Sequence, residues 1–328
     1  MAVTWRWGVA LLWLAPAGMA FQSPGSDGVG VAARVKREPR SIPGEAPRAE
    51  LRVDASLVEV PVHVTTFQGQ AVTNLKPENF RVLEDGVEQK ITYFTRDDAP
   101  LSVGLLFDAS GSMQNKIGKS AEASAAFVKT SNPQDEFFLI EFSDKPKLAV
   151  PFSMNPEAIY KRIARMRPFG RTALLDAIHM ALLQMKNAKN LRKAIVIVSD
   201  GGDNRSRYTA GEVKEGMLES DVQLYAMGIF DWPALRSVKR LPVEERNGPR
   251  LLDELAEETG GRHYPVEELD DLPSISERIS RDLRNEYVIG YSPSNAARDG
   301  KYRRIQLEVA GGEKLKADYR HGYYAPAQ

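Results

Sequence analysis

The sequence of 328 residues contains no cysteine, and this absence excludes several kinds of chemistry at once. Disulfides, thiolate metal sites, iron–sulfur clusters and cysteine nucleophiles are all ruled out. The four histidines, at positions 63, 179, 263 and 321, lie far apart and have no metal-ligand spacing. Any metal that the protein binds is therefore expected to have oxygen ligands.

The chain also lacks an excess of charge of either sign, because 44 Lys and Arg residues balance 44 Asp and Glu residues. A protein that neutralises phosphates needs a basic surplus or a basic stripe, so we expect no nucleic-acid partner. A hydrophobic content of 42% with 27% charged residues is typical of a globular protein. The length suits one large domain or two ordinary ones.

Residues 1–20 have the pattern of a secretory signal peptide. Arg6 is the only charge, residues 9–15 form an apolar run, and Gly18 and Ala20 place small side chains before a cleavage site. The run is too short to span a bilayer, so we expect a secreted protein, periplasmic or extracellular, with no stable membrane span after cleavage. A retained membrane anchor is the alternative if cleavage fails.

Residues 21–50 are poor in apolar side chains and contain four prolines and charges of both signs. This composition predicts a flexible linker. A basic arm for nucleic acid is the alternative, but the interspersed acidic residues disfavour it.

Residues 51–99 show the period of two that is typical of β-strands. Val58, Val60, Val62 and Val64 share one face, and Pro61 favours an edge position because proline has no N–H for a ladder hydrogen bond. We expect the strand at residues 80–83 to turn at residues 84–86 and to pair with residues 91–94. This segment is predicted to be the first part of a small β-sandwich.

Residues 101–285 alternate between apolar strands and amphipathic helices. Asn155 and Pro156 form a helix start, and Thr209 with Glu212 has the form of a capping box. The alternation predicts an α/β domain with a doubly wound, mostly parallel sheet that helices cover on both faces. Strands are expected at 101–107, 137–142, 194–198 and 222–229, and helices at 117–128, from 156 to about 166, and at 174–185, 209–220, 251–259 and 272–283.

The alternating pattern returns in residues 286–325, with strands expected near 287–291, 305–309 and 315–319. Because residues 51–99 are too few for a whole sandwich, we expect the C-terminal segment to be its second part. The α/β domain would then be an insertion within one β-sandwich.

Five oxygen-bearing side chains fall at the ends of predicted buried strands or at a helix start. Ligands of open parallel sheets gather at the carboxyl ends of the strands. Hydroxyls and carboxylates are hard ligands that suit Mg²⁺ or Mn²⁺. The candidate metal ligands are Asp108, Ser110, Ser112, Thr172 and Asp200. Taken one at a time, each of these residues also fits a helix cap or a turn.

The spacing of Asp108, Ser110 and Ser112, followed by Thr172 and Asp200, resembles a von Willebrand factor A domain with a metal-ion-dependent adhesion site. The resemblance covers about residues 101–285, and the mature chain also resembles bacterial secreted proteins that contain this domain. It implies that Ser110 and Ser112 ligate the metal directly, Thr172 directly or through water, and the two aspartates largely through water. It also implies a protein partner that offers an Asp or Glu carboxylate to the ion.

Three further residues are candidates for a partner-binding rim. Arg171 either meets the partner's carboxylate or pairs with an acidic residue of a nearby loop. Asp203 and Asn204 either tune the rim or belong to a solvated loop.

Two other functions compete with a secreted, non-enzymatic binding module for adhesion or scaffolding. An Asp after a buried strand is also found in Mg²⁺-dependent phosphatases, which use it as a nucleophile. Those phosphatases need a second acid two residues on, where this chain has Ser110. The remaining alternative is an accessory subunit of an ATP-driven complex, which the export signal disfavours. No G-x-S-x-G elbow, phosphate loop or H-E-x-x-H helix occurs, so we expect no enzyme.

Overall fold

The computed structural model describes residues 57–96, 98–230, 243–311 and 314–327. The predicted signal peptide and the predicted linker lie outside these ranges. The described residues belong to one compact unit.

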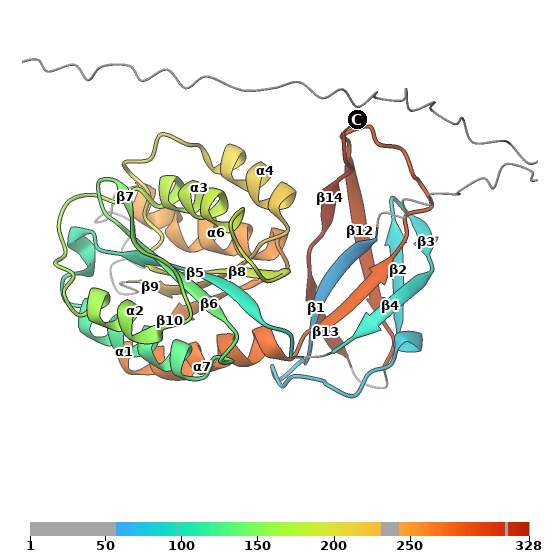
Figure 1. The fold of residues 1–328 in the computed structure, drawn as a ribbon, viewed down its shortest axis with the longest axis horizontal. Helices are drawn as coiled ribbons and strands as arrows, with labels where there is room; N and C mark the ends of the chain where they lie inside the picture. The colour runs from blue at the N-terminus through green and yellow to red at the C-terminus, as the bar shows by residue number, and fades with distance from the viewer. Residues whose placement is uncertain (1–56, 97, 231–242, 312–313, 328) are drawn as a thin grey trace, which may run out of the picture. The chain divides into compact units, whose positions relative to one another are not determined.

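A six-stranded sheet forms the centre of the α/β domain (Figure 1). Its order is β10-β9-β8-β5-β6-β7, and all neighbouring strands are parallel except β6 and β7. β5 is the first strand of this sheet along the chain, and β6 and β7 follow on one side of it. The next strands, β8, β9 and β10, lie on the other side of β5. The order therefore reverses between β5 and β8, where ligands of such sheets bind. The strands are β5 (Leu101–Asp108), β6 (Glu136–Phe142), β7 (Pro146–Ser153), β8 (Arg192–Ser199), β9 (Gln223–Ile229) and β10 (Arg262–Val266).

Helices cover both faces of this sheet, as the apolar runs of its strands require. One hydrophobic core joins one face of the sheet to α1 (Ile117–Lys129), α2 (Pro156–Ile163) and α7 (Leu272–Arg284). A second core joins the other face to α3 (Leu174–Met185), α4 (Ala210–Ser220) and α6 (Val243–Glu258). Asn155 caps α2 and Thr209 with Glu212 caps α4, as expected. Short 3-10 helices span Pro77–Asn79, Gly111–Met113 and Leu269–Asp271.

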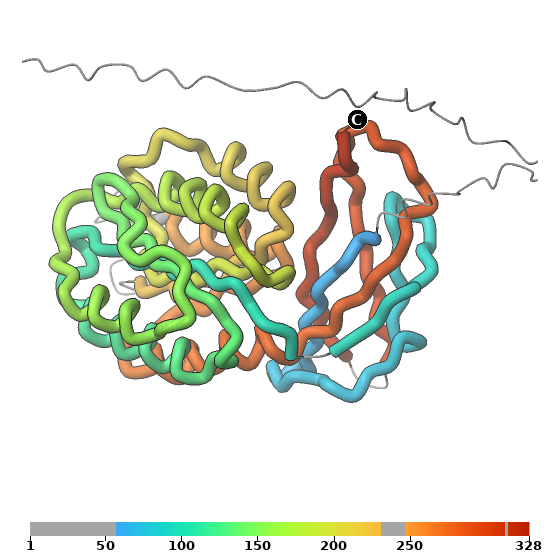
Figure 2. The backbone as a smooth tube through the Cα atoms, in the orientation of Figure 1, coloured from blue at the N-terminus to red at the C-terminus, as the bar shows by residue number. Residues whose placement is uncertain are grey.

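The segments on either side of the α/β domain build a β-sandwich together (Figure 2). One sheet has the order β13-β1-β11-β4 and the other β14-β12-β2-β3, so each sheet mixes strands from both segments. Their apolar faces share one core, which includes Val60, Val62, Tyr287 and Ile289. The predicted fold class is confirmed. The strands are β1 (Val58–Thr66), β2 (Phe80–Glu84), β3 (Val87–Gln89), β4 (Ile91–Thr95), β11 (Tyr287–Tyr291), β12 (Tyr302–Val309), β13 (Leu315–Tyr319) and β14 (Gly322–Tyr324).

The predicted hairpin partner of β2 is wrong. β2 pairs with β3, while residues 91–95 cross to the other sheet as β4 and pair with β11. The turn consists of Asp85 and Gly86, whose φ angles of 49° and 82° suit a two-residue hairpin loop. After such a tight turn the next strand begins at Val87. No strand was predicted there, because the sequence is mostly polar.

The edge position predicted from Pro61 is also wrong, because β1 lies inside its sheet. β11 pairs with residues 58–62 and β13 pairs only with residues 62–66. Pro61 therefore lies one residue before β13 begins to pair, where it interrupts no hydrogen bond of that ladder.

Some elements were not predicted. The sequence pattern did not predict the strands β7, β10 and β14. β7 is only partly buried and contains two prolines, and β10 and β14 are short. Helix α6 begins eight residues before the predicted start, and Pro249 lies inside it. Among the helices in the described ranges, none has the length and apolar character needed to cross a membrane.

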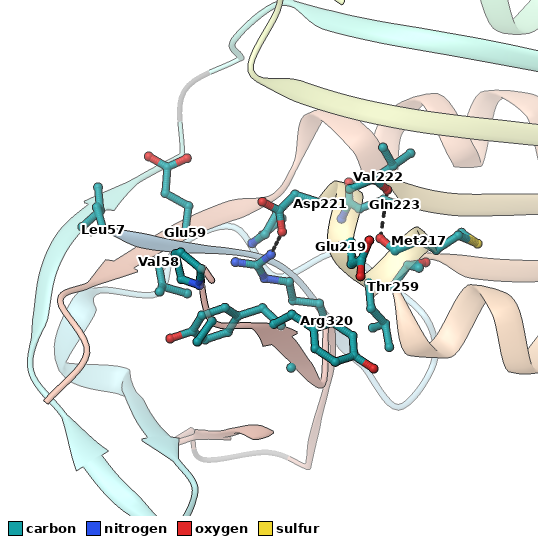
Figure 3. A pocket seen from close by; sticks show the side chains of 18 of the residues that line it. Leu57, Val58, Glu59, Met217, Glu219, Asp221, Val222, Gln223, Thr259 and Arg320 are labelled. Atoms are coloured by element: carbon teal, nitrogen blue, oxygen red, sulfur yellow. Dashed lines mark hydrogen bonds and ion pairs between the residues drawn. The ribbon is translucent and has the colours of Figure 1, made fainter. Parts of the chain in front are cut away.

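A cavity of about 450 Å³ lies beside β1, α4 and β14 (Figure 3). The Arg320 guanidinium pairs there with the Asp221 carboxylate, and burial lowers the pKa of Arg320 to about 10. Arg192 and Lys193 place the cavity at the amino end of β8. At about 3.3 Å per residue, it lies about 25 Å from the carboxyl end of this strand. The cavity is therefore separate from the predicted metal ligands.

A buried carboxylate joins the two sheets of the sandwich. Glu84 of β2 is only 2% exposed and accepts hydrogen bonds from the hydroxyls of Tyr291 (2.8 Å) and Tyr323 (2.9 Å).

Tyr291→Phe removes one of these donors, so we expect the free energy of unfolding to fall by about 1–3 kcal/mol. Urea denaturation measures this change. Tyr93→Phe, at a tyrosine that is 44% exposed, is the control. Equal effects of the two changes would contradict the role of Glu84.

Candidate functional site

The loop after β5 begins at a fully buried carboxylate. Asp108 is 0% exposed, and its two oxygens accept hydrogen bonds from the Ser110 N–H (2.8 Å) and the Ser199 hydroxyl (2.6 Å). Ser199 ends the neighbouring strand β8. The carboxylate therefore ties the ends of the two strands together at the point where the strand order reverses.

The two serines of this loop bring their hydroxyls together. The Oγ atoms of Ser110 and Ser112 lie 3.0 Å apart. Ser110 is buried, while Ser112 is exposed in the 3-10 turn that follows. The pair therefore lies between the buried Asp108 and solvent.

A second loop packs its backbone against the first. The Phe169 N–H donates to the Ala109 carbonyl (2.9 Å), and the Gly111 N–H donates to the Gly170 carbonyl (3.1 Å). Gly170 has a φ of 74°, and a Cβ atom there would lie 2.8 Å from the Asp144 carboxylate. Only glycine fits this position without strain, so the loop is fixed where it meets residues 109–111.

Thr172 follows in this loop, two residues before α3 begins, and is buried. Its backbone N–H donates to the Asn204 side chain (3.0 Å), and its carbonyl accepts from the N–H groups of Asn204 and Arg205. Within the described ranges its hydroxyl makes no hydrogen bond, so it remains available to a ligand.

The third loop follows β8 and carries Asp200. One oxygen of Asp200 accepts from the Gly202 N–H (3.3 Å), and the other lies 3.8 Å from the Lys116 ammonium. Lys116 in turn donates to the carbonyl of Ile229, the last residue of β9 (2.8 Å). Lys116 is thus a cation placed beside the predicted metal ligands.

The two carboxylates of the site influence each other. Burial, and then the negative charge of Asp200, raise the pKa of Asp108 to about 7. Hydrogen bonds from Ser110 and Ser199 oppose this rise. A cation between the carboxylates would stabilise the ionised form of both.

The residues predicted for the rim have defined positions. Asp203 accepts hydrogen bonds from the Leu175 N–H (2.8 Å) and the Ser206 hydroxyl (2.6 Å), so it caps the start of α3. Asn204 holds the backbone of Thr172. Arg171 is exposed, and its backbone N–H donates to Asp144 (2.9 Å). Asp203 and Asn204 therefore shape the loops, and contact of any of the three with a partner stays a prediction.

The sequence pattern did not predict a role for Lys116 or Ser199 in the site. Ser199 directly precedes Asp200 but reads as the last residue of a buried strand. Lys116 precedes α1, where a positive charge opposes the helix dipole. This unfavourable position of a lysine is the feature of the sequence that could have indicated a role for Lys116.

The donor set fits a small hard cation. The described residues contain no group of three or more His, Asp or Glu side chains that could hold a metal. Any site here must therefore use hydroxyls as well as carboxylates. Two adjacent ligands of an octahedral Mg²⁺ with bonds of 2.0–2.1 Å are about 3 Å apart. The Ser110 and Ser112 oxygens, at 3.0 Å, have this separation.

Residues 103–202 match the family model of the von Willebrand factor type A domain. The UPF0353 protein of Mycolicibacterium paratuberculosis is 24% identical over 213 residues, which are 57% of this chain and 62% of that protein. Inter alpha-trypsin inhibitor heavy chain 4 of Mus musculus is 26% identical over 247 residues, which are 69% of this chain and 25% of that protein. The chain thus spans 62% or less of the length of these two relatives.

Among solved structures, the von Willebrand factor type A protein from Catenulispora acidiphila is 13% identical and superposes with a TM-score of 0.49. The match covers 84% of this chain and 75% of that one.

The raised pKa of Asp108 predicts a pH dependence of stability in metal-free buffer with EDTA. Because the pKa is about 7 in the folded protein and 3.8 for an ordinary, solvated aspartate, ionisation is harder in the folded state. The cost is absent below about pH 4, grows as the pH rises, and is complete above about pH 7. Asp108→Asn removes this cost.

The free energy of unfolding of Asp108→Asn, relative to the unchanged protein, should therefore rise between pH 4 and pH 7 by a few kcal/mol. Urea denaturation at a series of pH values measures this difference. A difference that stays constant with pH would contradict the buried, charge-coupled state of Asp108.

Proposed function

The chain contains a von Willebrand factor type A domain, and we propose that this domain binds Mg²⁺ or Mn²⁺ and uses the ion to bind a protein partner. The proposed ligands are Ser110, Ser112 and Thr172, with Asp108 and Asp200 acting largely through water. The partner would supply an Asp or Glu carboxylate.

The observation that carries this proposal is the pair of serine oxygens 3.0 Å apart beside the buried Asp108. Two further features support it. The Thr172 hydroxyl is free of hydrogen bonds to the described residues. Asp200 lies close enough to raise the pKa of Asp108, which indicates two carboxylates that favour a shared cation.

The charges of the site favour an outside anion. Hydroxyl ligands are neutral, so only Asp108 and Asp200 can neutralise the charge of a divalent ion. Lys116 adds a further positive charge beside them. The bound ion, the two carboxylates and the lysine then sum to a positive centre. Such a centre attracts a carboxylate to the ion's open position.

We propose a secreted binding module and not an enzyme. The signal pattern of residues 1–20 supports export. Phosphatase-like attack by Asp108 is disfavoured because both of its oxygens accept hydrogen bonds and the side chain is fully buried. A nucleophile needs an accessible lone pair.

The metal assignment predicts that Ser110→Ala and Ser112→Ala each weaken Mg²⁺ or Mn²⁺ binding at least about tenfold, because each removes a proposed direct ligand. Titration calorimetry with the metal alone measures the affinity. Ser274→Ala, at an exposed serine of α7, is the matched control. Asp108→Ala should abolish binding, and binding equal to that of the unchanged protein would refute the metal site.

The same variants test partner binding. Capture of proteins from a native extracellular extract should be lost both in EDTA and with Ser110→Ala. Capture that survives both changes would place the partner on another face.

Lys116 predicts a change in the opposite direction. Its ammonium, 3.8 Å from Asp200, repels a divalent cation, so Lys116→Met should tighten Mg²⁺ binding by about tenfold. Lys119→Met is the matched control, because the Lys119 side chain is 43% exposed and pairs with Glu122 and Asp270. Thermal unfolding reports any loss of fold from the missing bond to Ile229. Weaker binding by a folded Lys116→Met would contradict this electrostatic role.

A further inference from the structure

A second recess adjoins the loop that carries the serines. Its volume is about 310 Å³, and it is lined by residues from the ends of β6 and α2, from β7 and from the segments that follow β6 and α2. Ala109, which lies between Asp108 and Ser110, forms part of its wall. The Ala109 backbone bonds to Phe142 at the end of β6 and to Phe169. The recess therefore adjoins the loop that carries three of the candidate metal ligands.

The recess is strongly basic although the chain as a whole carries no net charge. Glu141 is its only acidic lining residue, and it pairs with Arg162 and lies 3.9 Å from Lys147. The other basic lining residues are exposed and form no ion pair with any residue that the structure describes. They are Lys145, Arg165 and Arg167.

The recess also offers apolar contacts. Phe169 is 61% exposed, and the buried Met166 also lines the recess. An exposed aromatic side chain among arginines is a composition that favours protein–protein contact.

We propose that this basic recess binds an acidic segment of the protein partner, next to the carboxylate that reaches the metal. This inference rests on the proposed function. A polypeptide can place Asp or Glu side chains against Lys145, Arg165 and Arg167 and an apolar side chain against Phe169. A polyphosphate supplies the charge but no apolar group for Phe169.

The test uses the full mature chain and two fluorescein-labelled synthetic peptides of twelve residues. One peptide alternates Glu with Leu and Phe, and the other has Gln in place of every Glu. Fluorescence anisotropy with Mg²⁺ present measures binding at low and at physiological salt. We expect binding of the acidic peptide, weaker binding at higher salt, and little binding of the Gln peptide.

Charge reversal at the recess is the decisive variant. The triple variant Lys145→Glu, Arg165→Glu and Arg167→Glu should bind the acidic peptide at least about tenfold more weakly. The matched control makes the same change of net charge at three exposed lysines elsewhere, Lys90→Glu, Lys186→Glu and Lys189→Glu. This control should bind the peptide within about twofold of the unchanged protein.

Two outcomes would overturn the inference. If both triple variants lose the same affinity, net charge and not the recess determines binding. If heparin or phosphatidylglycerol vesicles bind the recess more tightly than the acidic peptide, the occupant is not a protein segment. Calorimetry with Mg²⁺ alone distinguishes failure of this inference from failure of the proposed function. The triple variant at the recess should still bind Mg²⁺, because it keeps the metal site. If the unchanged protein binds no Mg²⁺, the proposed function is refuted.

Discussion

The site depends on one buried charge, the carboxylate of Asp108. A buried carboxylate is costly unless donors or a cation compensate it. Ser110 and Ser199 each supply one donor, and they fix the loops after β5 and β8 against each other. Asp200 then adds a second negative charge close by. The structure thus concentrates negative charge beside two serine hydroxyls, which is the arrangement that a divalent cation would stabilise.

The strand order explains why these groups meet. The strand order reverses between the parallel strands β5 and β8. The loops after these two strands therefore lead to opposite sides of the sheet and leave space between them. The loop before α3 closes this space from the side through backbone bonds to residues 109 and 111. Asn204 and Asp203, from the loop after β8, hold the same loop and the start of α3. Two of the residues predicted to face a partner therefore also hold the backbone that carries Thr172, a candidate metal ligand.

The net charge of the chain is zero, but two of its cavities differ in charge. The recess beside the site has five basic lining residues and one acidic residue. The cavity at the amino end of β8, by contrast, is lined by residues of both signs, and its Arg320 is paired with Asp221. The recess at the carboxyl ends of the strands is therefore more basic than the cavity at the amino end of β8. A partner that binds there meets positive charge both at the proposed ion and in the recess.

Sequence patterns alone predicted the alternation of strands and helices, the insertion of the α/β domain within a β-sandwich, and the candidate ligands. These follow from local periodicity and from residues that directly succeed buried strands. The pairing of β2 with β3, the interior position of Pro61 and the presence of Lys116 beside Asp200 became visible only in the folded chain. These depend on contacts between residues far apart in the chain or on the geometry of a turn, which periodicity does not encode. The basic recess arises in the same way, because its residues come from separate elements that only the folded sheet brings together.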